Sequence, residues 1–125
     1  MDSKLRERVL SGVNRNCRTL RQIGNASAAD RGQKWLLRQV EASLSVAADY
    51  VIRLPRKYSR SNEVTFETES GTQIIRFDEE FDRKEVRAWL MYALHILDGA
   101  IFLSRPSETE LRQLRREVLN LIMLI

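Results

Sequence analysis

The sequence predicts a mainly α-helical protein of the α+β class, with four helices and a β-hairpin between the second and third helices. Over most of the 125 residues, apolar side chains recur every three or four positions, as in a helix with one buried stripe. Between residues 61 and 80 the period falls to two, which is typical of strands. We expect one domain over residues 1–125, with a basic helical hairpin at 1–60, a β-hairpin at 61–80 and an apolar helical pair at 81–125.

The first helix is expected from about Ser3 to Ile23, because this segment has one apolar stripe. The stripe consists of Leu5, Val9, Val13, Cys17 and Leu20. The opposite face carries Lys4, Arg8, Ser11, Arg15, Arg18 and Gln22. Gly24 and Asn25 follow as a helix stop. Four positive charges therefore line one side of the helix over roughly 20 Å.

The second helix is expected to begin near Ser27 or Asp30 and to end near Leu54, because Pro55 disfavours helical geometry in the residue before it. Its buried stripe consists of Leu36, Leu37, Val40, Leu44, Ala47, Ala48 and Val51. The outer face carries Arg31, Lys34 and Arg38 beside Trp35. Arg56 and Lys57 add positive charge to the linker that follows.

The hairpin is expected where Val64, Phe66 and Thr68 alternate with polar residues. Ser70 and Gly71 supply a turn before the second strand. If these two residues form the turn, Phe66 pairs with Ile75 and Val64 pairs with Phe77 on one face. Helices must cover two such strands to make them stable.

The third helix is expected to begin at Asp82, which together with Glu85 resembles a helix cap, and to run to about Ser104. Its interior is apolar nearly all round, which predicts a helix covered on several sides by its own chain or by a second copy. The apolar stretch from Ala88 to Leu103 contains His95 and Asp98 and falls short of the ~20 apolar residues of a membrane span. We therefore expect a buried helix and no membrane contact.

The fourth helix is expected to begin at a capping box formed by Ser107 and Glu110. The last seven residues carry no charge, so they either dock inside the monomer or form a subunit interface. A homodimer is expected on this basis. The expected interface residues are Trp89, Leu97, Ile101, Leu121, Ile122 and Ile125.

The sequence argues against an enzyme, a metal site and a bound cofactor. Zinc sites need clustered Cys and His, whereas this chain has only Cys17 and His95. Cys17 fits the buried stripe of the first helix, and His95 is expected in the core or at an interface. The five glycines form no phosphate-binding loop. One cysteine and no leader segment predict an intracellular protein, cytoplasmic or nuclear.

Charge is distributed unevenly along the chain. Residues 1–60 hold 13 Lys or Arg against 5 Asp or Glu, a net of +8, and residues 61–125 hold 8 against 12, a net of −4. Such a basic half predicts an anionic partner. The expected nucleic-acid-binding residues are Lys4, Arg8, Arg15, Arg18, Arg31, Lys34, Arg38, Arg56 and Lys57. If the two helices pack antiparallel, these residues form one patch that contacts a phosphate backbone without reading sequence, a mode suited to double-stranded RNA.

The arrangement of a basic helical pair with a self-association surface resembles that of small viral proteins that coat double-stranded RNA to block silencing. The resemblance covers residues 3–58, and it implies an RNA partner and a homodimer. Two alternatives stay open: a protein-interaction module, such as a viral or phage accessory factor that binds an acidic or apolar host protein, and a self-assembling structural protein.

Overall fold

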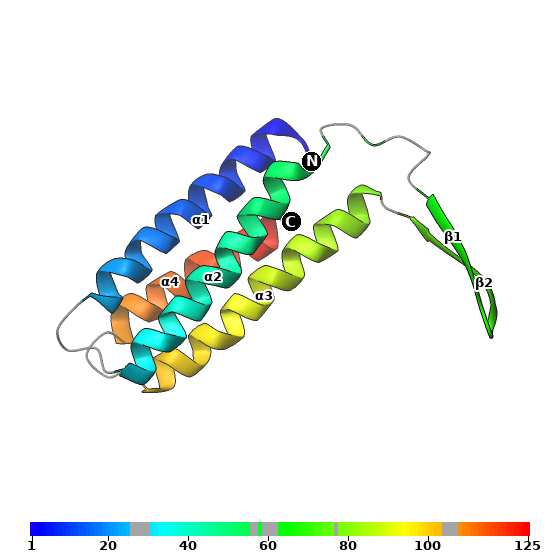
Figure 1. Ribbon diagram of the computed structural model, residues 1–125. Helices are drawn as coiled ribbons and strands as arrows, with labels where there is room; N and C mark the ends of the chain where they lie inside the picture. Colours follow the sequence, from blue (N-terminus) through cyan, green and yellow to red (C-terminus); the bar gives the residue numbers. More distant parts are fainter. Residues whose placement is uncertain (26–30, 56–57, 59–62, 77, 104–107) are drawn as a thin grey trace.

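Four helices form an up-and-down bundle, and a β-hairpin projects from one end of it (Figure 1). The structure, a computed structural model, describes residues 1–25, 31–55, 58, 63–76, 78–103 and 108–125. The helices are α1 (Ser3–Gly24), α2 (Arg31–Arg53), α3 (Glu79–Leu103) and α4 (Glu108–Leu124). The strands β1 (Glu63–Thr68) and β2 (Gly71–Arg76) lie between α2 and α3. The predicted class and element order are confirmed.

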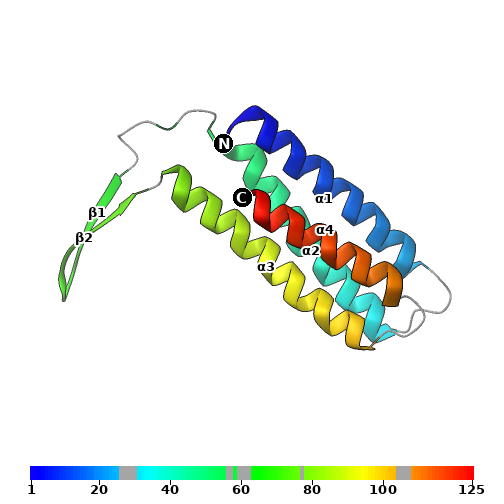
Figure 2. The same ribbon diagram turned by 180° about the vertical axis from the view of Figure 1, so that it is seen from behind.

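Each helix packs against its two neighbours in the bundle: α1 against α2 and α4, and α3 likewise against α2 and α4. α1 and α3 therefore occupy diagonal corners. Both chain ends lie at the end of the bundle from which the hairpin leaves (Figure 2). α1 and α3 end, and α2 and α4 begin, at the other end of the bundle, so neighbouring helices run antiparallel.

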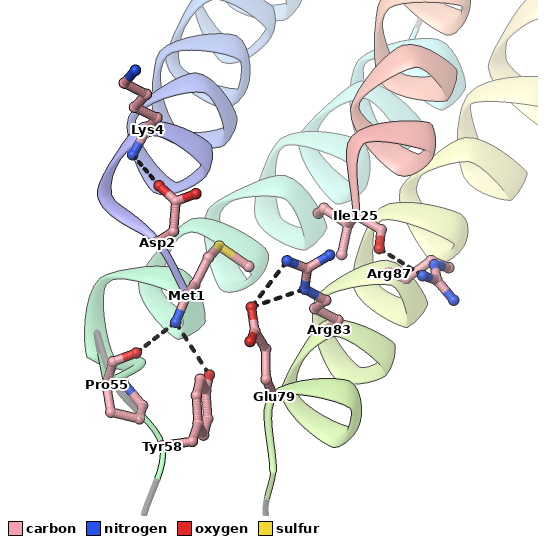
Figure 3. Close-up of polar contacts among 9 residues, drawn as sticks. All are labelled: Met1, Asp2, Lys4, Pro55, Tyr58, Glu79, Arg83, Arg87 and Ile125. Carbon is pink, nitrogen blue, oxygen red and sulfur yellow. Dashed lines mark hydrogen bonds and ion pairs between the residues drawn. The ribbon is translucent and has the colours of Figure 1, made fainter.

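One buried stripe from each helix forms the core, as the three-to-four spacing predicts. Side chains that are at most 2% exposed include Val9, Val13, Leu20, Leu37, Val40, Leu44, Val51, Val86, Leu90, Leu97, Leu111, Leu114 and Val118. Leu121, Ile122 and Ile125 are also buried, and Arg87 donates a hydrogen bond to the backbone carbonyl of Ile125 at 2.7 Å (Figure 3). The uncharged C-terminal segment thus docks inside the monomer, one of the two alternatives left open by the sequence.

The start of the third helix differs from its prediction. α3 begins at Glu79, and Asp78 caps it by accepting a hydrogen bond from the N–H of Phe81 at 2.9 Å. Asp82, the predicted cap, lies inside the helix, where it is 8% exposed and accepts a hydrogen bond from the Tyr50 hydroxyl at 3.1 Å. The predicted starts of the second helix at residues 27–30 and of the fourth at residue 107 lie outside the described residues.

The hairpin has a different register from the predicted one. Phe66 lies opposite Gln73 and Val64 opposite Ile75, with Thr68 and Gly71 as the last pair before the turn. The φ angle of Gly71 is +116°, a conformation that favours glycine, so this residue follows the turn and does not form part of it. Because the register is shifted by two residues, the same side chains still share a face. The predicted partner Phe77 lies outside the described residues.

The third helix is not buried on all sides. Its outward face exposes Met91, Tyr92, Phe102 and Leu103, and Phe102 is 87% exposed. Among the described helices, only α3 is long enough and apolar enough to cross a membrane, judged by length and composition alone. The core helix of a helical bundle also meets these two criteria. The bundle provides only two neighbouring helices for α3, so its own chain leaves this face uncovered. Cover by a second copy, the other alternative that the sequence predicts, stays a prediction.

Candidate nucleic-acid interface

The outer side of α1 displays its predicted cations to solvent. Lys4, Arg8, Arg15 and Arg18 are all exposed, because they lie opposite the buried stripe that contains Val9. Asp2 fixes the start of the helix by accepting a hydrogen bond from the backbone N–H of Lys4 at 2.7 Å (Figure 3). A helix of 22 residues is about 33 Å long, and these charges extend over roughly 20 Å of it.

The antiparallel packing of α1 and α2 brings part of the predicted set together at the end of the bundle that is remote from the hairpin. Lys34 and Arg38 of α2 share a pocket of about 180 Å³ with the last turns of α1. We call it the seam pocket; it is lined by Leu20, Arg21, Gly24, Asn25, Lys34, Leu37, Arg38 and Glu41. Among the described residues, three cations and one carboxylate line this pocket, which gives these residues a net positive charge. Arg31, one turn before Lys34, is exposed at the same end.

Arg21 was missed by the sequence-based prediction, although it lies in the seam pocket. Its Nε atom is 2.6 Å from Oε1 of Glu41, and the Arg21 side chain remains 66% exposed. The signal that could have found it is helical geometry: Arg21 follows the buried Cys17 by four residues, so it lies at the edge of the stripe that meets α2. A cation at this edge can contact both α2 and an external anion.

Arg8 and Arg15 lie on the other flank of α1, toward α4. They line a groove of about 710 Å³ whose walls also include Glu7, Ser11, Gly12, Glu117, Asn120, Leu121, Met123 and Leu124. Arg15 lies 3.7 Å from Glu117 of α4, a long and exposed ion pair of little energetic weight. The predicted cations therefore wrap around α1, from the groove beside α4 to the seam pocket beside α2, and do not form one flat patch.

The cations of α1 and α2 differ from those of the rest of the chain in how they are paired. Within the described residues, six predicted binding residues make no ion pair with the protein's own carboxylates: Lys4, Arg8, Arg18, Arg31, Lys34 and Arg38. Beyond α2, five of the seven described cations pair with carboxylates at 2.5 to 3.4 Å, and Arg87 and Arg116 do not; the five are Arg76, Arg83, Lys84, Arg112 and Arg115. Unpaired positive charge is thus concentrated on α1 and the first half of α2.

Part of this unpaired charge opposes the helix dipole. Arg31 and Lys34 lie at the beginning of α2, and the first turn of that helix contains no acidic residue. Cations are disfavoured there by a few tenths of a kcal/mol each, because the N-terminal end of a helix carries partial positive charge. Local helix stability does not explain these two residues, whereas an anion bound beside them would relieve the repulsion.

Arg56 and Lys57 complete the predicted set, and two aromatic residues, Trp35 and Tyr58, lie near these cations in the sequence. Arg56 and Lys57 lie outside the described residues. Trp35 is 59% exposed beside Arg31 and Arg38, so its ring is accessible. Tyr58 is half-buried, and its hydroxyl accepts a hydrogen bond from the amino group of Met1 at 3.4 Å (Figure 3). It therefore contributes to the fold.

Four of the six predicted interface residues are unavailable to another chain. Leu97, Leu121, Ile122 and Ile125 are at most 9% exposed, because they fill the core of the bundle. Trp89 is 37% exposed and Ile101 is partly exposed, so these two retain surface on α3. The prediction placed an interface on side chains that hold the single chain together.

The two residues considered for chemistry are far from any reactive cluster. Cys17 is buried as predicted, and burial raises the pKa of its thiol. His95 is exposed on α3, so of its two expected positions, core or interface, the core position is wrong and the interface position stays a prediction. Among the described residues, no group of three His, Cys, Asp or Glu side chains could hold a metal ion.

Comparison with known proteins gives no match: no family model matches the chain, and no curated protein or solved structure is significantly similar to it. The resemblance to viral proteins that coat double-stranded RNA therefore rests on the expected arrangement of helices and charges, and no sequence or structural match accompanies it.

Proposed function

We propose that this protein is a non-catalytic nucleic-acid-binding protein that holds the backbone of RNA, with double-stranded RNA favoured. The binding surface is the outer side of α1 together with the first half of α2. The observation that supports it is the contrast in pairing: six cations of this surface make no ion pair within the described residues, while five of the seven described cations beyond α2 do.

Backbone contact is the mode that fits the shape of this surface. The cations are spread along and around a helix about 33 Å long, and no basic loop or helix end among the described residues projects from them. Such a surface neutralises phosphates along a duplex and reaches few base edges. Double-stranded RNA is recognised largely in this way, through shape and backbone contacts, because its deep major groove hides the bases.

The test is a binding series on a short RNA duplex with a charge-reversal variant. Replacing Arg15, Arg18 and Arg38 with Glu should lower the affinity at least about 100-fold at moderate salt, because several phosphate contacts become repulsive. The control variant changes Arg76, Lys84 and Arg112 to Glu. It makes the same change in net charge at side chains that are 71%, 65% and 61% exposed. Its affinity should fall less than about fivefold.

Parallel arms with double-stranded DNA and single-stranded RNA test the choice of nucleic acid. Tightest binding to the RNA duplex is expected. If single strands bind most tightly, we would instead infer that the exposed ring of Trp35 stacks on bases. If no nucleic acid binds at 50 mM salt, the proposal fails, and an acidic protein becomes the partner to seek.

A further inference from the structure

The hairpin has one uncharged face and one charged face. Val64, Phe66, Thr68, Gln73 and Ile75 share the first face, as the register of the strands shows. The second face carries Glu63, Glu67 and Arg76, with Glu63 and Arg76 paired at 2.9 Å. Val64 is 50% exposed and Phe66 37% exposed. The hairpin is therefore amphipathic, and its apolar face is uncovered.

The bundle of the same chain does not cover this face. All residues of β1 are exposed, as are all residues of β2 except the partly exposed Ile75. Both ribbon views show the hairpin extending away from the helices (Figures 1 and 2). A two-stranded hairpin alone is marginally stable in water and needs a helix or further strands against its apolar face.

α3 also has an apolar face that the rest of the bundle leaves uncovered. Asp98 is the only Asp, Glu, Lys or Arg between Ala88 and Leu103, and it pairs with Arg115 of α4 at 2.5 Å. Trp89 and Tyr92 pack edge to face, with ring centroids 6.3 Å apart and an interplanar angle of 84°. Together with Met91, Phe102 and Leu103 they form an apolar surface directed away from α1.

We propose that two copies of this chain associate by exchanging hairpins, so that the apolar face of each hairpin packs on the outward face of the partner's α3. This inference goes beyond nucleic-acid binding and does not depend on it. The second copy is the occupant that supplies both missing surfaces at once: a helix for each hairpin and a cover for each α3.

The available area is sufficient for a stable dimer. Seven of the large apolar side chains with substantial exposure lie on these two surfaces: Val64, Phe66, Trp89, Met91, Tyr92, Phe102 and Leu103. Their exposed fractions amount to roughly 700 Å² per chain if a fully exposed large side chain offers about 200 Å². Standard stable interfaces bury about 600–1,000 Å² per partner.

The dimensions also fit a two-fold arrangement. A six-residue strand spans about 20 Å, and the 25 residues of α3 span about 37 Å. The hairpin leaves the bundle next to the N-terminal end of α3. If the two α3 helices lie antiparallel, each hairpin meets the C-terminal half of the partner helix, where Phe102 is 87% exposed. α1 lies at the diagonal corner and stays free for RNA.

The first experiment measures mass in solution by analytical ultracentrifugation. The wild-type protein should be a dimer, and Phe66→Glu and Phe102→Glu should each weaken dimerisation at least about tenfold, because each places a charge in an apolar contact. The control is Met123→Glu on α4, whose side chain is 78% exposed but lies on neither surface. It should remain dimeric. A monomeric wild type, or dimerisation unaffected by both variants, overturns the proposal.

The second experiment identifies the contact itself. A photo-cross-linking amino acid replaces Phe66, and this protein is mixed with isotopically heavy wild-type protein. Light-to-heavy cross-links to residues 91–103 are expected in the mass spectrum. The proposal is overturned if the cross-links stay within one chain, or if they join the probe to the partner's hairpin or to other helices. It is also overturned if the hairpin of the purified protein is found bound to an unrelated protein.

Discussion

The Nε atom of Arg21 lies 2.6 Å from Oε1 of Glu41 across the seam between α1 and α2. Among the residues that the structure describes in the seam pocket, Glu41 is the one carboxylate, beside Arg21, Lys34 and Arg38. Glu41 therefore forms an ion pair with Arg21, a cation that would otherwise be free to contact an incoming phosphate.

Glu41→Gln should increase the affinity for duplex RNA about three- to tenfold, because it removes an internal competitor without changing the shape of the side chain. The effect on stability should be under about 1 kcal/mol, since the pair is partly exposed. Fluorescence anisotropy with a labelled duplex measures the affinity. Glu63→Gln is the matched control: it removes a partner of Arg76 on the hairpin, and RNA affinity should not change. Equal affinities for wild type and Glu41→Gln would remove the seam pocket from the binding surface.

Stability should fall at alkaline pH through Tyr50. Burial, followed by its hydrogen bond to Asp82, raises the pKa of Tyr50 from its ordinary value of 10.0 to about 12. The fold therefore favours the neutral phenol, so this contribution is complete below pH 10 and is lost as the pH rises from 10 to about 12. Burial raises the pKa of Tyr58 as well.

Urea unfolding at pH 8, 10 and 11 measures this dependence. Tyr50→Phe should flatten the decline above pH 10. Tyr92→Phe, at a ring that is 58% exposed, should retain the wild-type decline. Identical pH profiles for Tyr50→Phe and wild type would contradict the assignment.

Gly12 sets the close approach of α1 and α4. A Cβ atom added there would lie 2.6 Å from Cδ2 of Leu121, a side chain that is 5% exposed in the core. Gly12→Ala should destabilise the protein by about 1–2 kcal/mol despite the better helix propensity of alanine. A double-mutant cycle with Leu121→Ala checks the cause, because the smaller side chain makes room for the new methyl group. The double variant should be more stable than the sum of the two single changes by at least about 0.5 kcal/mol. Strict additivity would show that the clash is not the reason.

Asn16 is a polar residue in the core of the bundle. It is 0% exposed, and neither its amide nitrogen nor its amide oxygen has a hydrogen-bond partner among the described residues. Asn16→Leu should raise the free energy of unfolding by about 1–3 kcal/mol, because an apolar side chain of similar size removes the cost of burying the amide. Thermal and urea melts measure the change. A loss of stability greater than about 1 kcal/mol would show that the amide makes stabilising hydrogen bonds.

The helices were predictable because their signal is periodic and local. Val9, Val13 and Leu20 fall on one stripe and are buried, and Lys4, Arg8 and Arg18 fall on the opposite face and are exposed. The hairpin register was not predictable to the residue, because it depends on where a positive φ angle is needed, and Gly71 satisfies that need after the turn.

The candidate site was predictable in composition but not in shape. The spacing identified the exposed cations of each helix. It could not show that Arg8 and Arg15 turn toward α4, because that depends on which helix becomes the second neighbour of α1. Leu97 and Ile122, two of the predicted interface residues, are buried in the core of the single chain for a related reason: an apolar pattern does not tell burial inside one chain from burial between two.

The central claim is tested most directly by the salt dependence of binding to a 20-base-pair RNA duplex. If about six phosphates are neutralised, the logarithm of the affinity should fall linearly with the logarithm of the salt concentration, with a slope near −5. The affinity would then drop by roughly a thousandfold between 50 and 200 mM salt. No detectable binding at 50 mM salt, or an affinity that changes less than about threefold over this range, would contradict the claim that unpaired cations of α1 and α2 hold an RNA backbone.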